Sequence, residues 1–180
     1  RLTVSSGNCS DDTLITVSVN PSPVAAFTPS AVTGCGPTTI NFSNATTGSP
    51  TYTWNFGDGG TSTTANPSHL YSLAGTYSVT LIATQGSCAD TILSNNLITI
   101  APQPFSSFSA TNVCVGDSVR FTNLSNGNGG TISGYSWNFG DGSPANTSTS
   151  PSHLYATAGS YQVRLTVSSG NCSDDTLITV

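Results

Sequence analysis

The two ends of the chain carry the same sequence. Residues Arg1 to Val17 read RLTVSSGNCSDDTLITV, and residues Arg164 to Val180 repeat them without a change and without a gap. Self-similarity at a fixed period is the sequence signature of a repeat architecture. We therefore expect the chain to be one period, plus an overlap, of a longer array.

A weaker repeat lies inside this period. YTWNFGDGG at residues 52–60 returns as YSWNFGDGS at residues 135–143, and PSHLYSLAGTYSVTL at residues 67–81 returns as PSHLYATAGSYQVRL at residues 151–165. The period therefore holds two related modules of roughly 80 residues, each the size of a small domain. We predict module 1 at residues 20–101 and module 2 at residues 102–180, and assign residues 1–19 to the C-terminal strands of a preceding module.

Hydrophobic residues in both modules recur at every second position, as in the series Tyr77, Val79, Leu81 and its counterpart at residues 161–167. This spacing predicts strands with one buried face, because successive side chains of a strand point to opposite faces. Runs rich in Gly, Asn, Pro and Ser separate these segments and are typical of turns. The predicted fold class is all-β, with tandem immunoglobulin-like sandwiches in an extended array.

Three spaced motifs, each present twice, resemble the signature of the PKD domain family. They are Trp54 to Gly59 (WNFGDG), His69 to Tyr71 (HLY) and Gly75 to Leu81 (GTYSVTL), with second copies at residues 137–142, 153–155 and 159–165. The resemblance implies a seven-strand sandwich of secreted or surface proteins that acts as a spacer or interaction module. Many members have Asp between the Trp and the Phe, where this chain has Asn55 and Asn138.

Charge is scarce along the chain. Only 6% of residues are charged, the net charge is −5, and the three cations are Arg1, Arg120 and Arg164. Nucleic-acid binding therefore lacks its usual electrostatic source. No apolar run is long enough to insert into a membrane. We expect an extracellular or cell-surface protein that binds no nucleic acid and is not inserted into a membrane through these residues.

Four of the five cysteines hold equivalent places in the two modules. Cys35 and Cys114 each open a strand, while Cys88 and Cys172 each follow the Tyr-x-Val-x-Leu strand. This equivalence predicts the disulfides Cys35–Cys88 and Cys114–Cys172 within modules, and leaves Cys9 to pair with an upstream module. Disulfides indicate an oxidising compartment. Zinc binding is the alternative, although the chain has no Cys-x-x-Cys spacing.

The histidines and the turn aspartates recur once in each module. A catalytic histidine needs a nucleophile and an orienting acid nearby, and no motif supplies them. Recurrence in each module favours a structural role, in which His69 and His153 bond to a loop. Asp58 and Asp141 lie in Gly-Asp-Gly turns, which favour a tight hairpin; a calcium site is the alternative. The pairs at residues 11–12 and 174–175 are interpreted as solvated turns. We predict no catalytic, cofactor-binding or metal-binding residues, and no enzyme activity.

Several hydroxyl and amide side chains lie in glycosylation-like sequences. Asp-(Ser/Thr)-apolar tripeptides resemble the O-glycosylation sites of Bacteroidetes and indicate a bacterial source of that type; they contain Thr13, Thr91, Ser118 and Thr176. Asn-x-Ser/Thr acceptors include Asn41, Asn44, Asn123 and Asn146. The alternative for the threonines is that they suit a strand. A surface with so few charges needs another source of solubility, so we predict glycans on some of these sites.

The segments between modules are short and contain alternating prolines, at residues 20–23 and 101–104. Such segments are extended and semi-rigid, which favours a rod over freely jointed modules. We therefore predict a structural repeat unit of a long extracellular filament or cell-surface stalk, whose partners are neighbouring copies of the repeat. The alternative is an adhesin, or a carbohydrate- or protein-binding module of a secreted protein.

Overall fold

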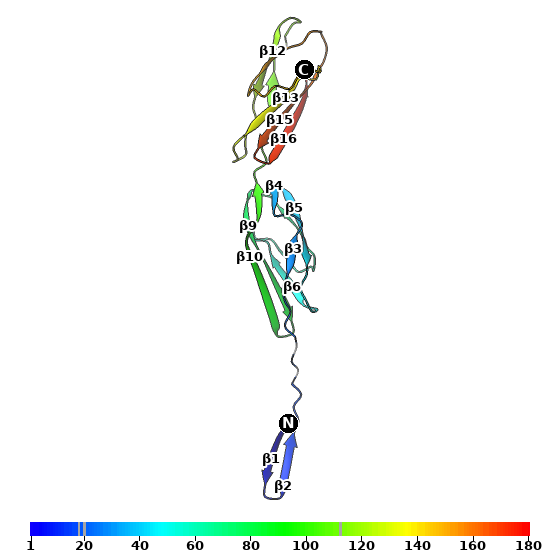
Figure 1. The fold of residues 1–180 in the computed structure, drawn as a ribbon, viewed down its shortest axis with the longest axis vertical. Helices are drawn as coiled ribbons and strands as arrows, with labels where there is room; N and C mark the ends of the chain where they lie inside the picture. Colours follow the sequence, from blue (N-terminus) through cyan, green and yellow to red (C-terminus); the bar gives the residue numbers. More distant parts are fainter. Residues whose placement is uncertain (18, 20, 112) are drawn as a thin grey trace.

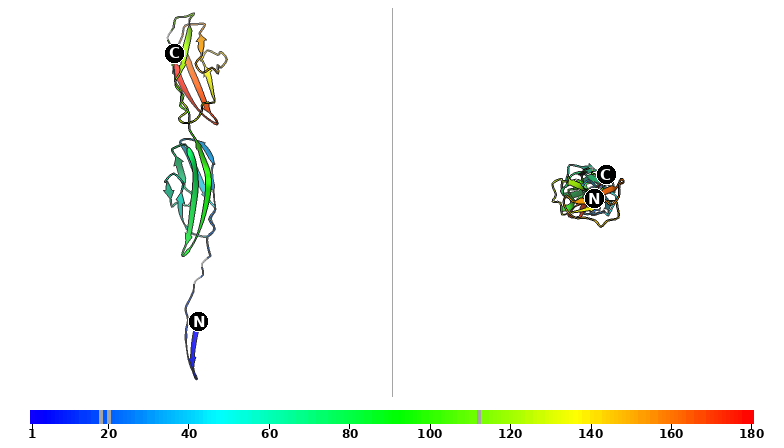
Figure 2. Two further views of the ribbon diagram at one scale, coloured as in Figure 1. Left: turned by 90° about the vertical axis from the view of Figure 1, so that its left-hand side faces the viewer. Right: turned by 90° about the horizontal axis from the view of Figure 1, so that it is seen from above.

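The two modules are separate β-sandwiches that follow one another end to end. The computed structural model describes residues 1–17, 19, 21–111 and 113–180. Within this part of the chain all regular elements are strands, and no helix is long and apolar enough to cross a bilayer. The molecule is narrow and long, with a lone hairpin at the N-terminal end, then module 1, then module 2 (Figures 1 and 2).

Module 1 consists of two sheets packed face to face. One sheet has the strand order β4-β10-β9-β6-β7 and the other has the order β3-β5-β8. The strands of this module are β3 (Phe27–Pro29), β4 (Thr33–Cys35), β5 (Thr38–Asn44), β6 (Thr51–Asn55), β7 (Thr61–Ser62), β8 (Ser68–Tyr71), β9 (Gly75–Gln85) and β10 (Cys88–Ala101). All pairs are antiparallel except β4 with β10, which is parallel and places Ala101 beside Cys35.

Module 2 repeats this plan with fewer paired strands. Its sheets have the orders β13-β15-β16 and β11-β12-β14. The strands are β11 (Phe108–Ala110), β12 (Ser118–Asn123), β13 (Gly134–Asn138), β14 (Ser152–Leu154), β15 (Gln162–Ser169) and β16 (Cys172–Thr179). In place of β7, Asn146 exchanges two backbone hydrogen bonds with Trp137.

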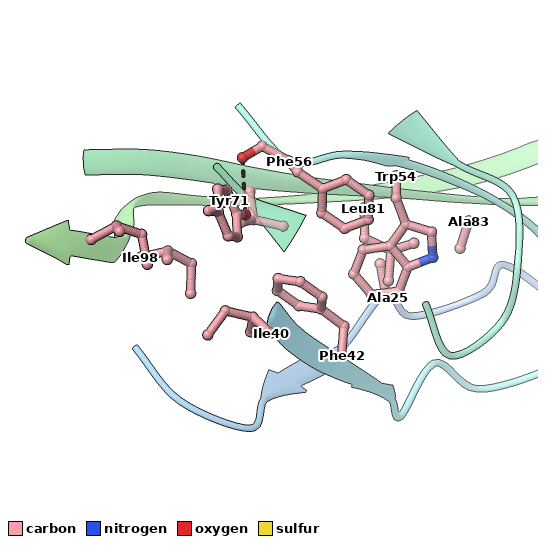
Figure 3. Close-up of a cluster of buried hydrophobic side chains, with 11 residues drawn as sticks. Ala25, Ile40, Phe42, Trp54, Phe56, Tyr71, Leu81, Ala83 and Ile98 are labelled. Carbon is pink, nitrogen blue, oxygen red and sulfur yellow. Dashed lines mark hydrogen bonds between the residues drawn. The ribbon is translucent and has the colours of Figure 1, made fainter. Parts of the chain in front are cut away.

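Each core is built from the alternating residues of the facing sheets. Trp54 is fully buried in module 1, where Phe42 packs against it (Figure 3). The ring of Phe27 also contacts Trp54, with a centroid distance of 5.2 Å. Burial of one such ring stabilises the fold by about 3 kcal/mol. The Trp54 indole N–H donates to the Thr64 carbonyl oxygen at 2.9 Å, so its one polar group is satisfied. Trp137 repeats this arrangement, which confirms the predicted all-β, immunoglobulin-like class.

The N-terminal hairpin has the sequence of the last hairpin of module 2 but no sandwich around it. It consists of β1 (Leu2–Ser6) and β2 (Cys9–Thr13), paired in the same register around the turn as β15 and β16. Val4 is 62% exposed here, whereas its identical counterpart Val167 is fully buried. The local sequence therefore determines the hairpin, and the burial of its apolar face depends on the rest of a module.

Candidate functional site: the junction between the modules

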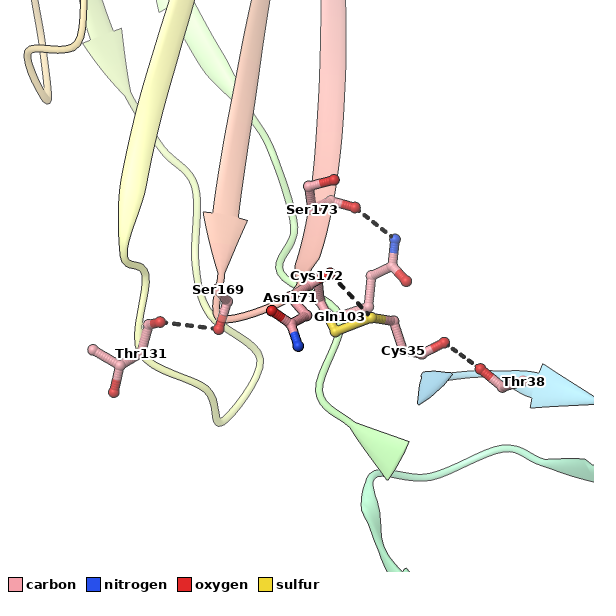
Figure 4. Close-up of a disulfide and its surroundings, with 8 residues drawn as sticks. All are labelled: Cys35, Thr38, Gln103, Thr131, Ser169, Asn171, Cys172 and Ser173. Carbon is pink, nitrogen blue, oxygen red and sulfur yellow. Dashed lines mark hydrogen bonds between the residues drawn. A yellow bond between two sulfur atoms is a disulfide. The ribbon is translucent and has the colours of Figure 1, made fainter. Parts of the chain in front are cut away.

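The junction between the modules carries a disulfide that crosses from one sandwich to the other. Cys35 at the end of β4 is bonded to Cys172 at the start of β16, at a sequence separation of 137 and a Cα–Cα distance of 5.6 Å (Figure 4). Cys172 is 2% exposed. The bond therefore joins the C-terminal end of module 1 to the hairpin of module 2 that points back toward it.

This bond corrects both pairings predicted within modules, Cys35–Cys88 and Cys114–Cys172. Cys88 begins β10, and Cys35 pairs with Ala101 at the opposite end of the same strand. The length of this strand is about 40 Å, far beyond the reach of a disulfide. In module 2, Cys172 begins β16, whereas Cys114 borders a pocket with Val180, just beyond the other end of that strand. The two cysteines of each module therefore lie at opposite ends of its sandwich.

The linker at this junction is bonded to both modules. The Gly36 N–H donates to the Ala101 carbonyl oxygen at 3.0 Å on the side of module 1. On the side of module 2, the Gln103 side chain donates to the Ser173 carbonyl oxygen at 3.1 Å, and the Gln103 backbone carbonyl accepts from Asn128 at 3.0 Å. With prolines at 102 and 104, these bonds and the disulfide restrict rotation of one module against the other.

An aspartate near each hairpin anchors the segment that leads into the first strand of its own module, a role that the sequence did not reveal. Asp174 accepts a hydrogen bond from the Ser106 N–H at 2.8 Å, and Asp90 accepts one from the Ala25 N–H at 2.8 Å. The interpretation of residues 174–175 as a solvated turn was therefore wrong for Asp174. The available signal was the motif Cys-x-Asp, which recurs at Cys9, Cys88 and Cys172.

The histidine of each module clamps the Gly-Asp-Gly turn. His69 Nε2 lies 2.7 Å from Asp58 Oδ2, and the His69 ring stacks on Phe56 with a centroid distance of 4.1 Å. His153 contacts Asp141 at the same distance and stacks on Phe139. The predicted bond between each histidine and a loop is confirmed.

Both aspartates of these turns have a lowered pKa. For Asp58, partial burial raises the pKa, but hydrogen bonds from His69 and from the Gly60 N–H outweigh this effect. For Asp141, hydrogen bonds from the Ser143 hydroxyl and from His153 hold the pKa well below its usual range. Both oxygens of each carboxylate accept from protein donors, an arrangement suited to bracing a turn.

Among the described residues, no group of three or more His, Cys, Asp or Glu side chains is placed to hold a metal ion. The calcium site considered for the Gly-Asp-Gly turns would need the carboxylate oxygens that the histidines and the turn backbone contact. The chain therefore offers a braced turn at each of these positions, with the histidine as its support.

The glycosylation-like residues differ in accessibility. Thr13, Thr91, Ser118 and Asn41 are exposed, whereas Thr176, Asn44, Asn123 and Asn146 are partly buried. The Thr176 hydroxyl donates to the Ser106 carbonyl oxygen, and the Asn44 Nδ2 atom is buried. Thr13 has the same sequence context as Thr176 and lies on the lone hairpin. Within modules 1 and 2, Thr91, Ser118 and Asn41 are therefore the exposed residues of this group.

Comparison with known proteins assigns both modules to one domain family. The family model of the PKD domain matches residues 19–100 and 101–180. Collagenase ColA of Bacillus cereus is 67% identical over 30 residues, a segment of 17% of this chain and 3% of the collagenase.

Two solved PKD1 domains are similar over 43% of this chain. The PKD1 domain of Vibrio anguillarum Epp is 30% identical, is covered over 90% of its length and has a TM-score of 0.41. The PKD1 domain of the Vibrio cholerae metalloprotease PrtV is 34% identical, is covered over 94% and has a TM-score of 0.40. With its family matched along both modules, the chain belongs to the PKD domain family and contains two PKD domains in tandem.

Proposed function

We propose that this chain is a repeating, non-catalytic unit of a long extracellular filament or cell-surface stalk. The observation that carries the proposal is the hairpin β1–β2, which has the sequence and the turn register of β15–β16 but lacks a sandwich. Its exposed residues Leu2 and Val4 match Leu165 and Val167, which are fully buried. The apolar face of this hairpin fits the remaining strands of another copy of module 2.

The junction supports a structural role. A disulfide, a double-proline linker and hydrogen bonds from the linker to both modules hold the two sandwiches in line. Identical junctions along an array would give a straight, regular fibre with nearest-neighbour energetics. A stalk that holds its tip away from a cell surface needs this stiffness.

Glycans on the outer strands are part of the proposal. A surface with so few charged residues is poorly protected against association, and sugars on Thr91, Ser118 and Asn41 would cover exposed strand faces. Mass measurement of single-period peptides before and after chemical deglycosylation tests this part. Sugar mass on the Thr91 and Ser118 peptides, with none on the Thr176 peptide, is the expected result. Unmodified peptides at all these positions would contradict it.

The test of the filament is the mass of the native chain after reduction and denaturation, combined with electron microscopy of the native material. A repeat protein of many periods gives a very large species that survives reduction, and images of thin unbranched fibres. A discrete reduced chain that carries a catalytic domain beside these modules would contradict the proposal. Such a chain would support the second candidate, an appendage of a secreted enzyme, which the segment shared with a collagenase favours.

A further inference from the structure

We propose that the distal end of module 2 is the docking site for the next module of the array, and that Cys114 forms a disulfide there with the hairpin cysteine of that module, the equivalent of Cys88. This inference rests on the proposed function, because it takes the next module to be another copy of module 1. It assigns a partner to an exposed cysteine and makes the disulfide between modules 1 and 2 one example of a bond at every junction.

Cys114 has the same relation to module 2 as Cys35 has to module 1. Cys35 precedes the buried Phe42 by seven residues, and Cys114 precedes the buried Phe121 by seven. Phe42 and Phe121 occupy equivalent positions in β5 and β12, each packed against the module's tryptophan. Both cysteines therefore lie at the end of the sandwich that is remote from its hairpin, where the next module begins.

The hairpin cysteines also share one geometry. Cys9, Cys88 and Cys172 each pair with the residue just before a two-residue turn, namely Ser6, Gln85 and Ser169. The glycine of each turn has a positive φ, of 59°, 61° and 57°. Cys172 reaches the preceding module from this position. Cys88 and Cys9 occupy the same position on their hairpins, which directs them to the modules before theirs.

The spacing of the cysteines matches this scheme. The interval from Cys9 to Cys35 has the same length as the interval from Cys88 to Cys114, since 35 − 9 equals 114 − 88. Each interval runs from the hairpin of one module, through the linker, to the opening of the next module. Because the interval is equal at both kinds of junction, Cys35 and Cys114 occupy the same position relative to the preceding hairpin.

A pocket of about 280 Å³ borders Cys114, and its lining indicates which segment of the chain can fill it. Its lining includes Val113, Tyr155, Tyr161 and Val180. In module 1 the last residues of β10 fill the corresponding place: Ile98 and Ile100 are buried, and Thr99–Ala101 pair with β4.

The repeat supplies a sequence that fits this pocket. Val180 exchanges two backbone hydrogen bonds with Tyr161, and Ile98 is paired with Tyr77 across β9 and β10. Val180 is therefore the equivalent of Ile98. In the copy of this sequence at the N-terminal end, Val17 is followed two residues later by Val19, which matches the spacing of Ile98 and Ile100. The chain that follows Val180 in the array would therefore extend β16 into the pocket and lead directly to the next module.

The covalent step is an oxidation. Two thiols lose two protons and two electrons and form one S–S bond. The electrons pass by thiol–disulfide exchange to a disulfide-donating oxidant, which leaves as a dithiol. A thiol oxidase of the secretory route is the chemical class that supplies this disulfide.

The test is disulfide mapping of the native full-length protein. Free thiols are blocked with iodoacetamide, the protein is digested with pepsin at acid pH to prevent exchange, and linked peptides are identified by mass spectrometry. We expect two linked pairs in similar amounts: residues 113–117 with residues 86–90, and residues 33–37 with residues 169–173. An alkylated Cys114, or Cys114 linked to the Ser-Gly-Asn-Cys peptide, would overturn the inference.

The size of the chain is measured separately, so that the two proposals fail in distinguishable ways. A very large reduced chain with alkylated Cys114 keeps the array and rejects the bond. A short reduced chain whose Cys114 is linked to Cys88 of another molecule rejects the single giant chain and keeps the bond. The Cys35–Cys172 peptide is the internal control for complete oxidation in either case.

Discussion

Cys35 and Cys172 are bonded across the boundary of two modules although their sequence separation is 137. We predict that Cys35→Ser leaves both sandwiches folded and frees their relative orientation, because each has its own core. Small-angle scattering should show a broader distribution of end-to-end distances. In the chain-entropy model a loop of this length contributes about 5 kcal/mol against joint unfolding, so the variant should also melt earlier. Cys9→Ser is the matched control, since it removes a cysteine of identical local sequence from the lone hairpin. A Cys35→Ser variant with unchanged scattering would show that the linker alone holds the modules in line.

Replacement of Asp141 by Asn should lower the stability of module 2 by about 1 kcal/mol at neutral pH, because a charge-assisted hydrogen bond to His153 is lost. The lowered pKa of Asp141 gives a second expectation. A carboxylate whose folded pKa lies below its ordinary value of 3.8 stabilises the fold fully above that pH and loses the contribution as the pH falls below it. Acid titration of unfolding should therefore be steeper below pH 4 for the parent than for Asp141→Asn. Equal slopes would contradict this role of the carboxylate.

Two glycines of one turn should respond differently to alanine. Gly140 and Gly142 have φ values of 78° and 83°, so either alanine costs about 1 kcal/mol for the left-handed backbone. A Cβ at Gly140 would also collide with the backbone of Gln162, whereas a Cβ at Gly142 meets open space. Gly140→Ala should therefore cost about 3 kcal/mol or more in denaturant unfolding, with Gly142→Ala as the control. Similar losses at both sites would mean that the strand beside the turn can move away.

High pH should destabilise module 2 through Tyr155. Burial, followed by the charges of Asp141 and Tyr161, raises the pKa of Tyr155 to about 12 from an ordinary value of 10.0. A raised folded pKa means that the contribution is complete below pH 10 and is lost as the pH rises toward 12. Tyr155→Phe removes this dependence and also the 3.1 Å hydrogen bond to the Phe139 carbonyl oxygen. Denaturant midpoints between pH 9 and 12 should therefore fall less in the variant. An equal fall of the denaturant midpoint in the parent and in Tyr155→Phe would mean that other groups cause the loss of stability at high pH.

The fold followed from local patterns because the alternation within each strand identifies its buried face. The alternation at residues 77–81 and 161–167 corresponds to β9 and β15, and the repeated Trp-x-Phe placed both tryptophans in the cores. The histidine clamp was predictable for a similar reason, since recurrence in each module favours a role in the fold of each module.

The disulfide pairing was not predictable from equivalence, because equivalence says nothing about distance along a strand. Cys88 begins the 14-residue strand β10, whereas Cys35 lies on β4 beside Ala101, the last residue of β10. The length and direction of β10 decide the pairing, because they place Cys35 too far from Cys88 for a bond within the module and close to the next module. The contact of Asp174 with Ser106 was hidden likewise, because 68 residues separate the two partners.

The bond between Cys35 and Cys172 gives a tensile load a short covalent route. With the same bond at every junction, force enters at a hairpin cysteine such as Cys9, follows the chain to the next opening cysteine, Cys35, and crosses to the module beyond. The segment between these two cysteines can extend to about 90 Å, whereas a whole period without bridges would extend to roughly 550 Å. Two such routes, one through Cys35 and one through Cys114, run side by side along the array. Unfolding a sandwich would then release almost no length, and a fibre of these modules would behave as an inextensible cord.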